Sequence, residues 1–107
     1  MSAVLGIDTA TDVLAVAVSA DGRVVREVAI GPGEDGRPRH SRLLLREVEA
    51  AVAEAGGWEA VGRIAVGVGP GSYTGLRIGI ATARALAQAR ALPLAPVVSL
   101  AALAAGI

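Results

Sequence analysis

Two short stretches of this chain carry residue types suited to binding an anion. The first is "GVGPGSYTGLRIG", Gly67 to Gly79, which joins an apolar strand-like run to a helix-like run. A glycine-rich turn before a helix exposes backbone N–H groups beside the positive end of the helix dipole, which suits an anion. The candidate anion contacts are Gly69, Gly71, Ser72 and Thr74. The same glycines would equally serve close packing alone, and both interpretations stay open.

The second stretch is "DTAT", Asp8 to Thr11, which follows the first apolar run. A carboxylate followed by hydroxyls can hold Mg²⁺ through water and face a phosphate. Asp8, Thr9 and Thr11 are the candidates for this role. An ordinary turn stabilised by the aspartate side chain explains the same pattern, and taken alone it is the favoured interpretation.

Several familiar catalytic patterns are missing from the sequence. A P-loop needs a lysine, and the chain has none; a dinucleotide fingerprint needs a later acidic residue, and none follows Glu59. His40 is the only histidine and there is no cysteine, which excludes a His-x-x-x-His metal site and a thiol nucleophile. We therefore predict no catalytic residue and no metal ligand.

Composition predicts one small domain with an unusual charge distribution. The chain has 107 residues, and 53% of them are hydrophobic, which suffices for a buried core. All ten acidic residues lie between Asp8 and Glu59, whereas every charge from Ala60 onward is an arginine. The uncharged end, Ala91 to Ile107, contains two prolines and a serine suited to a helix N-cap, so we expect a strand and a helix there and no membrane span.

Periodicity and turn residues predict the element order β-β-β-α-β-α-β-α. The strands are expected at 3–7, 13–19, 23–30, 63–69 and 94–99, and the helices at 41–55, 74–91 and from Ser99 onward. Asp-Gly at 21–22 predicts a hairpin, and strand–helix alternation requires parallel, right-handed crossovers. The prediction is an α/β fold in which helices pack on a mixed sheet.

The two main helices carry distinct faces. In the second helix, small residues recur every fourth position at 75, 79, 83 and 87, and a second stripe holds residues 77, 81, 84 and 88. One stripe should pack on the sheet and the other can meet a partner helix. The residues expected to supply core and partner interface are Leu44, Val48, Val52, Leu76, Ile80, Ala83, Arg84 and Ala87.

Long segments of the chain resemble the TsaB (YeaZ) family, which acts in the biosynthesis of threonylcarbamoyladenosine in tRNA. The matching stretches are "LGIDTAT", "HSRLLLREVEAAVAEAG", "AVGVGPGSYTGLRIGIATARALA" and "LPLAPVVSLAALA". The family more often has Asp-Thr-Ser in the first stretch and Phe at the Tyr73 position. The resemblance implies an actin-like ATPase (ASKHA, ribonuclease H-like) half-domain, with residues 1–107 forming a single lobe equivalent to the family's N-terminal half.

The resemblance also implies a function and a set of partners. It predicts a cytoplasmic, non-catalytic subunit that scaffolds a TsaD-like catalytic subunit through the helices 41–55 and 74–91. A TsaE-like ATPase would act through the complex, tRNA would be met indirectly, and the isolated chain would form a homodimer. No membrane contact is expected. The His-x-x-x-His metal site of the catalytic relative is missing from this chain.

Two enzymatic alternatives remain. In the first, the chain is a degenerate ASKHA nucleotide-binding enzyme whose phosphate loops are Asp8, Thr9, Thr11 and the turn from Gly69 to Thr74. No cofactor should bind tightly, and ATP with Mg²⁺ would bind weakly or only in an assembled complex, because the fold holds nucleotide between two lobes. The second, a glycoprotease-like metallopeptidase, is the least favoured, because metal-dependent hydrolysis needs about three protein ligands.

Overall fold

The structure is a computed structural model, and it describes residues 2–9, 13–31, 40–69 and 73–97. The helix expected from Ser99 onward lies outside the described residues.

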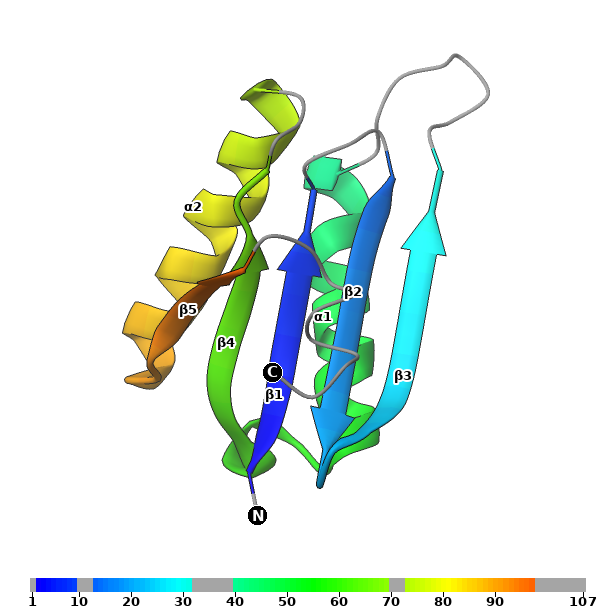
Figure 1. The fold of residues 1–107 in the computed structure, drawn as a ribbon, viewed down its shortest axis with the longest axis vertical. Helices are drawn as coiled ribbons and strands as arrows, with labels where there is room; N and C mark the ends of the chain where they lie inside the picture. Colours follow the sequence, from blue (N-terminus) through cyan, green and yellow to red (C-terminus); the bar gives the residue numbers. More distant parts are fainter. Residues whose placement is uncertain (1, 10–12, 32–39, 70–72, 98–107) are drawn as a thin grey trace.

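A five-stranded mixed sheet forms the centre of the fold (Figure 1). Its strand order is β3-β2-β1-β4-β5, with β1 antiparallel to β2, β2 antiparallel to β3, and both β1–β4 and β4–β5 parallel. This confirms the predicted α/β fold with its hairpin strands and parallel crossovers. The elements are β1 Ala3–Asp8, β2 Leu14–Ala20, β3 Arg23–Ile30, α1 His40–Ala55, η1 Trp58–Ala60, β4 Val61–Gly67, α2 Tyr73–Arg90 and β5 Leu94–Val97.

The hairpin between β2 and β3 forms where the sequence predicts it. Asp21 and Gly22 both have positive φ, 54° and 76°, which is the backbone of a type I′ turn. β3 differs from the prediction at one residue. Val24 was expected on the same face as Arg26, but Ser19 pairs with Val24 while Val18 pairs with Arg26. The extra residue, Val25, makes a bulge that moves Val24 to the opposite face.

The core lies between the sheet and the two helices, which cover the same face of the sheet (Figure 1). Alternate strand residues point toward the helices, as the period of two requires. The buried cluster combines Leu5 and Ile7 of β1, Val16 and Val18 of β2, Ile64 and Val66 of β4, Leu44 and Val48 of α1, and Ala83 and Ala87 of α2. The predicted small stripe of α2 therefore packs inward, since Gly79, Ala83 and Ala87 are all buried.

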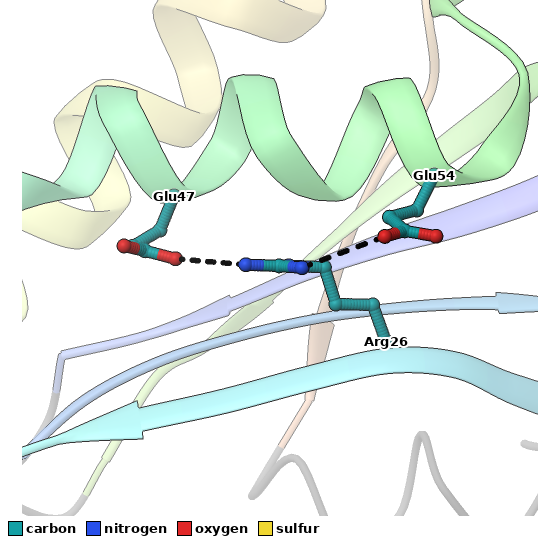
Figure 2. Close-up of polar contacts among 3 residues, drawn as sticks. All are labelled: Arg26, Glu47 and Glu54. Atoms are coloured by element: carbon teal, nitrogen blue, oxygen red, sulfur yellow. Dashed lines mark ion pairs between the residues drawn. The ribbon is translucent and has the colours of Figure 1, made fainter.

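An ion-pair cluster connects the edge strand to α1. Arg26 of β3 extends between Glu47 and Glu54 of α1, with 3.6 Å from its Nη2 to Glu47 Oε1 and 3.6 Å from its Nη1 to Glu54 Oε1 (Figure 2). Glu54 is half exposed, so that pair is screened by water, whereas the Glu47 side chain is only 14% exposed. Of the two pairs, Arg26–Glu47 is therefore the less screened by water.

No helix in the described part of the chain is long and apolar enough to cross a membrane.

Candidate functional site

The strand order brings the two chemically interesting stretches to one end of the sheet. β1 and β4 are parallel neighbours, with Ile7 beside Val66, so the residues that follow each strand emerge next to each other. Asp8 is the last residue of β1 and Thr9 follows it, while Gly67 is the last residue of β4. Ligands of open α/β sheets bind at this carboxyl end of the parallel strands.

Gly67 makes room for the carboxylate of Asp8. A Cβ atom on Gly67 would lie 2.6 Å from the carboxyl carbon of Asp8 and 2.7 and 2.9 Å from its two oxygens. Such contacts are closer than side chains tolerate, so the Asp8 carboxylate lies directly over the β4 backbone. A glycine inside a strand often marks a place where another backbone approaches closely. Here both helices lie on the Ile64 and Val66 side of the sheet, and the space at Gly67 holds the Asp8 side chain.

Gly79 plays the same part for Thr9. Thr9 is 1% exposed, and a Cβ atom on Gly79 would overlap with its hydroxyl oxygen. α2 can therefore lie against the end of β1 only because position 79 has no side chain. Thr9 thus contributes to the junction of β1 and α2, whether or not a ligand binds nearby.

The glycine-rich turn is described only at its two ends. Gly69 is buried and has a φ of 104°, a backbone conformation that glycine adopts far more readily than other residues. Thr74 lies in the first turn of α2. Thr11, Gly71 and Ser72 lie outside the described residues. Anion binding at this turn therefore stays a prediction.

The described residues contain no group of three or more His, Cys, Asp or Glu side chains placed to hold a metal ion. Asp8 is thus the carboxylate that the described part of the site would offer to a cation, and it would do so through water, as expected for Mg²⁺ bound to a phosphate.

The residues expected at the partner interface divide between core and surface. Five of them are buried inside the chain with 6% exposure or less: Leu44, Val48, Val52, Ala83 and Ala87. Ile80 is partly buried, Arg84 is exposed, and the side chain of Leu76 lies outside the described part. The core half of that prediction is confirmed. The five buried side chains are too enclosed to contact a partner, so an interface on these helices must use their outward-facing neighbours.

The outward-facing neighbours form a shallow apolar depression between the two helices. Leu45 is 55% exposed, the highest value among the large hydrophobic residues in the described part. The depression is lined by Leu45 of α1 and by Ala81, Thr82, Ala85, Leu86 and Ala89 of α2. We call this surface the helix groove.

Sequence reasoning missed the helix groove, although two signals point to it. Leu43, Leu44 and Leu45 are consecutive, and residues one apart on a helix lie about 100° apart around its axis, so they cannot all face the core. Ala81, Ala85 and Ala89 recur every fourth residue beside the buried stripe. Both patterns indicate a second apolar face.

The family model and the curated proteins that match this chain agree with one another. The model for tRNA N6-adenosine threonylcarbamoyltransferase, TsaD, matches residues 30–107. The tRNA threonylcarbamoyladenosine biosynthesis protein TsaB of Escherichia coli is 36% identical over 96% of this chain and 43% of its own length. The TsaB protein of Haemophilus influenzae is 33% identical over 94% of this chain and 41% of its own length.

Comparison with solved structures agrees. YeaZ from Pseudomonas aeruginosa superposes with a TM-score of 0.79 at 37% sequence identity, over 97% of this chain and 46% of that protein. The agreement confirms the predicted actin-like half-domain fold. The chain spans less than half the length of these relatives.

Proposed function

The chain belongs to the family that the TsaD model describes and, within it, to the TsaB (YeaZ) proteins, and on that premise we propose that it is a scaffold subunit in the biosynthesis of threonylcarbamoyladenosine in tRNA. In this proposal the chain performs no chemistry of its own. It docks a TsaD-like catalytic subunit against α1 and α2, in the cytoplasm.

The observation that supports this proposal is the helix groove. Exposed apolar surface between two helices marks an interaction site when its members are contiguous. Leu45 of α1 and Leu86 of α2 both line the groove. The other α2 residues that line it are mostly alanines, whose small side chains leave the surface hollow. An amphipathic helix of a partner fits such a surface, because its apolar ridge replaces water over both helices.

The proposal also includes the remaining expected partners. A homodimer of the isolated chain would cover the helix groove when no TsaD-like protein is available. A TsaE-like ATPase would act through the assembled complex, and tRNA would be bound through the catalytic subunit.

Substitution of Leu45 tests the docking surface. We expect Leu45→Asp to abolish both the homodimer and the complex with the TsaD-like protein of the same genome, because a carboxylate would be buried among alanines. Sedimentation velocity of the chain alone and in the mixture measures both. Leu45 is already exposed, so the far-UV circular dichroism of the variant should equal that of the parent chain.

Val25→Asp is the matched control for the same experiment. Val25 is 43% exposed on β3 and does not line the helix groove, so this variant should associate like the parent chain. Unchanged association of Leu45→Asp would refute the proposal. Ala83→Glu is not a clean test of the interface, because Ala83 is fully buried and the glutamate would destabilise the fold itself.

One observation favours the second candidate function, a nucleotide-handling enzyme of the same fold. The Asp8 carboxylate lies over the β4 backbone, next to the strand end that leads to Gly69. In this alternative Asp8 would hold Mg²⁺ through water beside the turn proposed for phosphate.

A further inference from the structure

The helix groove has a basic margin on the side of α2. Arg84 and Gln88 are exposed, and each follows by three residues an alanine that lines the groove, Ala81 and Ala85, so each lies beside it on the helix surface. Arg77 is also exposed and lies seven residues before Arg84, on the same side of α2 and about 10 Å away along its axis, and it takes part in an interaction within the chain. The margin therefore runs parallel to the groove over two helical turns.

No acidic residue of the same elements offsets this margin. The sequence has no Asp or Glu after Glu59, so β4, α2 and β5 carry positive charges only. The acidic residues near the groove belong to α1, where Glu49 is exposed four residues after Leu45. Glu47 and Glu54 are paired with Arg26 on the flank that faces β3 (Figure 2). α1 exposes both signs of charge, Arg46 and Glu49, whereas the charges of α2 are all positive.

We infer that the occupant of the helix groove is a protein helix whose apolar ridge is flanked by carboxylates on the side that meets α2. This inference rests on the proposed docking function and specifies the chemistry of the partner. Rim charges contribute mainly to partner choice and to the association rate, while the apolar floor contributes the contact area. Arg84 is the specificity-determining residue, because it lies next to the groove at the middle of the margin.

The charge pattern disfavours a second copy of this chain docked with α2 against α2. In a two-fold symmetric pair each residue near the axis meets its own equivalent, so Arg84 would approach Arg84 of the other copy. Like charges brought together across an interface oppose binding. If the partner instead has carboxylates at this position, they attract Arg84 and favour binding.

Association kinetics of charge variants test the inference. The probe is the TsaD-like protein of the same genome, and the association rate constant is measured at about 50 mM and about 500 mM salt, where screening differs strongly. Arg84→Gln should lower the rate at low salt by about threefold and Arg84→Glu by about tenfold or more, and both differences should shrink at high salt. Arg63→Gln is the matched control, because Arg63 is an exposed arginine on β4 and does not line the groove.

Each outcome separates this inference from the docking proposal. Suppose that Leu45→Asp abolishes binding while Arg84→Glu leaves the association rate and its salt dependence unchanged. Docking at the helix groove would then be supported, and the inference of carboxylates on the partner helix would be wrong. A faster association of Arg84→Glu would mean a basic partner and would also overturn the inference. If Arg84→Glu lost self-association and Glu49→Arg restored it in the double variant, the occupant would be a second copy bound α1 against α2.

Discussion

At the scale of single residues, two glycines determine how the end of β1 is packed. Gly67 leaves room for the Asp8 carboxylate, and Gly79 leaves room for the Thr9 hydroxyl. Gly67 is on β4 and Gly79 is on α2, twelve positions later in the sequence. They nevertheless lie against two consecutive residues, Asp8 and Thr9, at the end of β1. The glycine-rich stretch therefore has a packing role in the described structure, as one of the two open interpretations held.

Gly79→Ala tests that packing role. Within a helix, alanine is favoured over glycine by about 1 kcal/mol, so propensity alone predicts a more stable protein. The methyl group would overlap with Thr9, however, and overpacking a buried site costs about 1–3 kcal/mol. We expect a net loss in the free energy of unfolding, measured by urea denaturation.

The double variant with Thr9→Ala provides the control. Removing the threonine hydroxyl frees the space that the new methyl group needs, so Gly79→Ala should be better tolerated in a Thr9→Ala background. The coupling energy between the two sites should be about 1 kcal/mol or more. A coupling near zero, or a Gly79→Ala chain more stable than its parent, would show that Thr9 and α2 do not pack as described.

The candidate site could be predicted only in part, for a physical reason. Asp8, Thr9 and Gly69 stand out as candidates because their residue types are unusual after apolar strands, and a role in binding stays a prediction. The burial of Leu44, Val48 and Val52 follows from helical periodicity. The helix groove was missed because an exposed apolar face and a core face have the same composition in one helix, and only the position of the sheet distinguishes them.

At the scale of elements, the predicted strands and helices agree with the structure to within about two residues, the usual uncertainty of element ends. The predicted β4, 63–69, begins two residues earlier in the structure, at Val61, because it follows the short helix η1, which carries no sequence signal of its own. The bulge at Val25 was also missed. Val24 and Val25 are the same residue type, so the sequence does not show that one of them is extra in the pairing with β2. Local turn chemistry at Asp21-Gly22 and Gly56-Gly57 was the most reliable guide.

The end of α2 carries a strained residue that can be relieved. Ala91 follows the helix with a φ of 56°, and Leu92 N–H donates to the Ala87 carbonyl at 2.8 Å, as in a helix stop that normally uses glycine. The left-handed conformation costs a residue with a side chain about 1–2 kcal/mol. Glycine at position 91 would remove this cost, but part of the gain in stability is lost because glycine is more flexible in the unfolded chain. Ala91→Gly should therefore raise the free energy of unfolding by about 0.5–1 kcal/mol.

Ala89→Gly is the matched control for the helix stop. Ala89 lies inside α2 with an exposed side chain, where glycine lowers stability by about 1 kcal/mol. The two substitutions remove the same methyl group two residues apart, and they should shift the urea midpoint in opposite directions. Equal shifts of the same sign would mean that Ala91 is not strained in solution.

At the scale of the whole molecule, the chain order determines which groups meet. Hairpin strands followed by two right-handed crossovers place β1 at the middle of the sheet, between β2 and β4. The residues after β1 and β4 therefore emerge together, and both helices cover one face, which leaves the helix groove on their outer side. The docking surface and the strand-end site thus lie on different parts of the same lobe.

This separation allows the docking and nucleotide hypotheses to be tested independently. In the actin-like fold, nucleotide is held between two lobes, and this chain spans less than half the length of its relatives. Within the described residues, Asp8 and Gly69 are the candidate contacts, and both belong to the same lobe. We therefore predict that calorimetric titration of the chain with ATP and Mg²⁺ shows no saturable binding tighter than about 1 mM.

Asp8→Asn decides what any observed binding would mean. If nucleotide bound through a Mg²⁺ ion held at Asp8 by water, loss of the carboxylate charge would weaken the affinity at least tenfold, about 1.4 kcal/mol. Binding that is tight in the parent chain and lost in Asp8→Asn would favour the nucleotide-handling enzyme over the scaffold. The same variant should dock its partner like the parent chain, because Asp8 does not line the helix groove. A docking defect in Asp8→Asn would show that the two surfaces are coupled, contrary to their separation in the lobe.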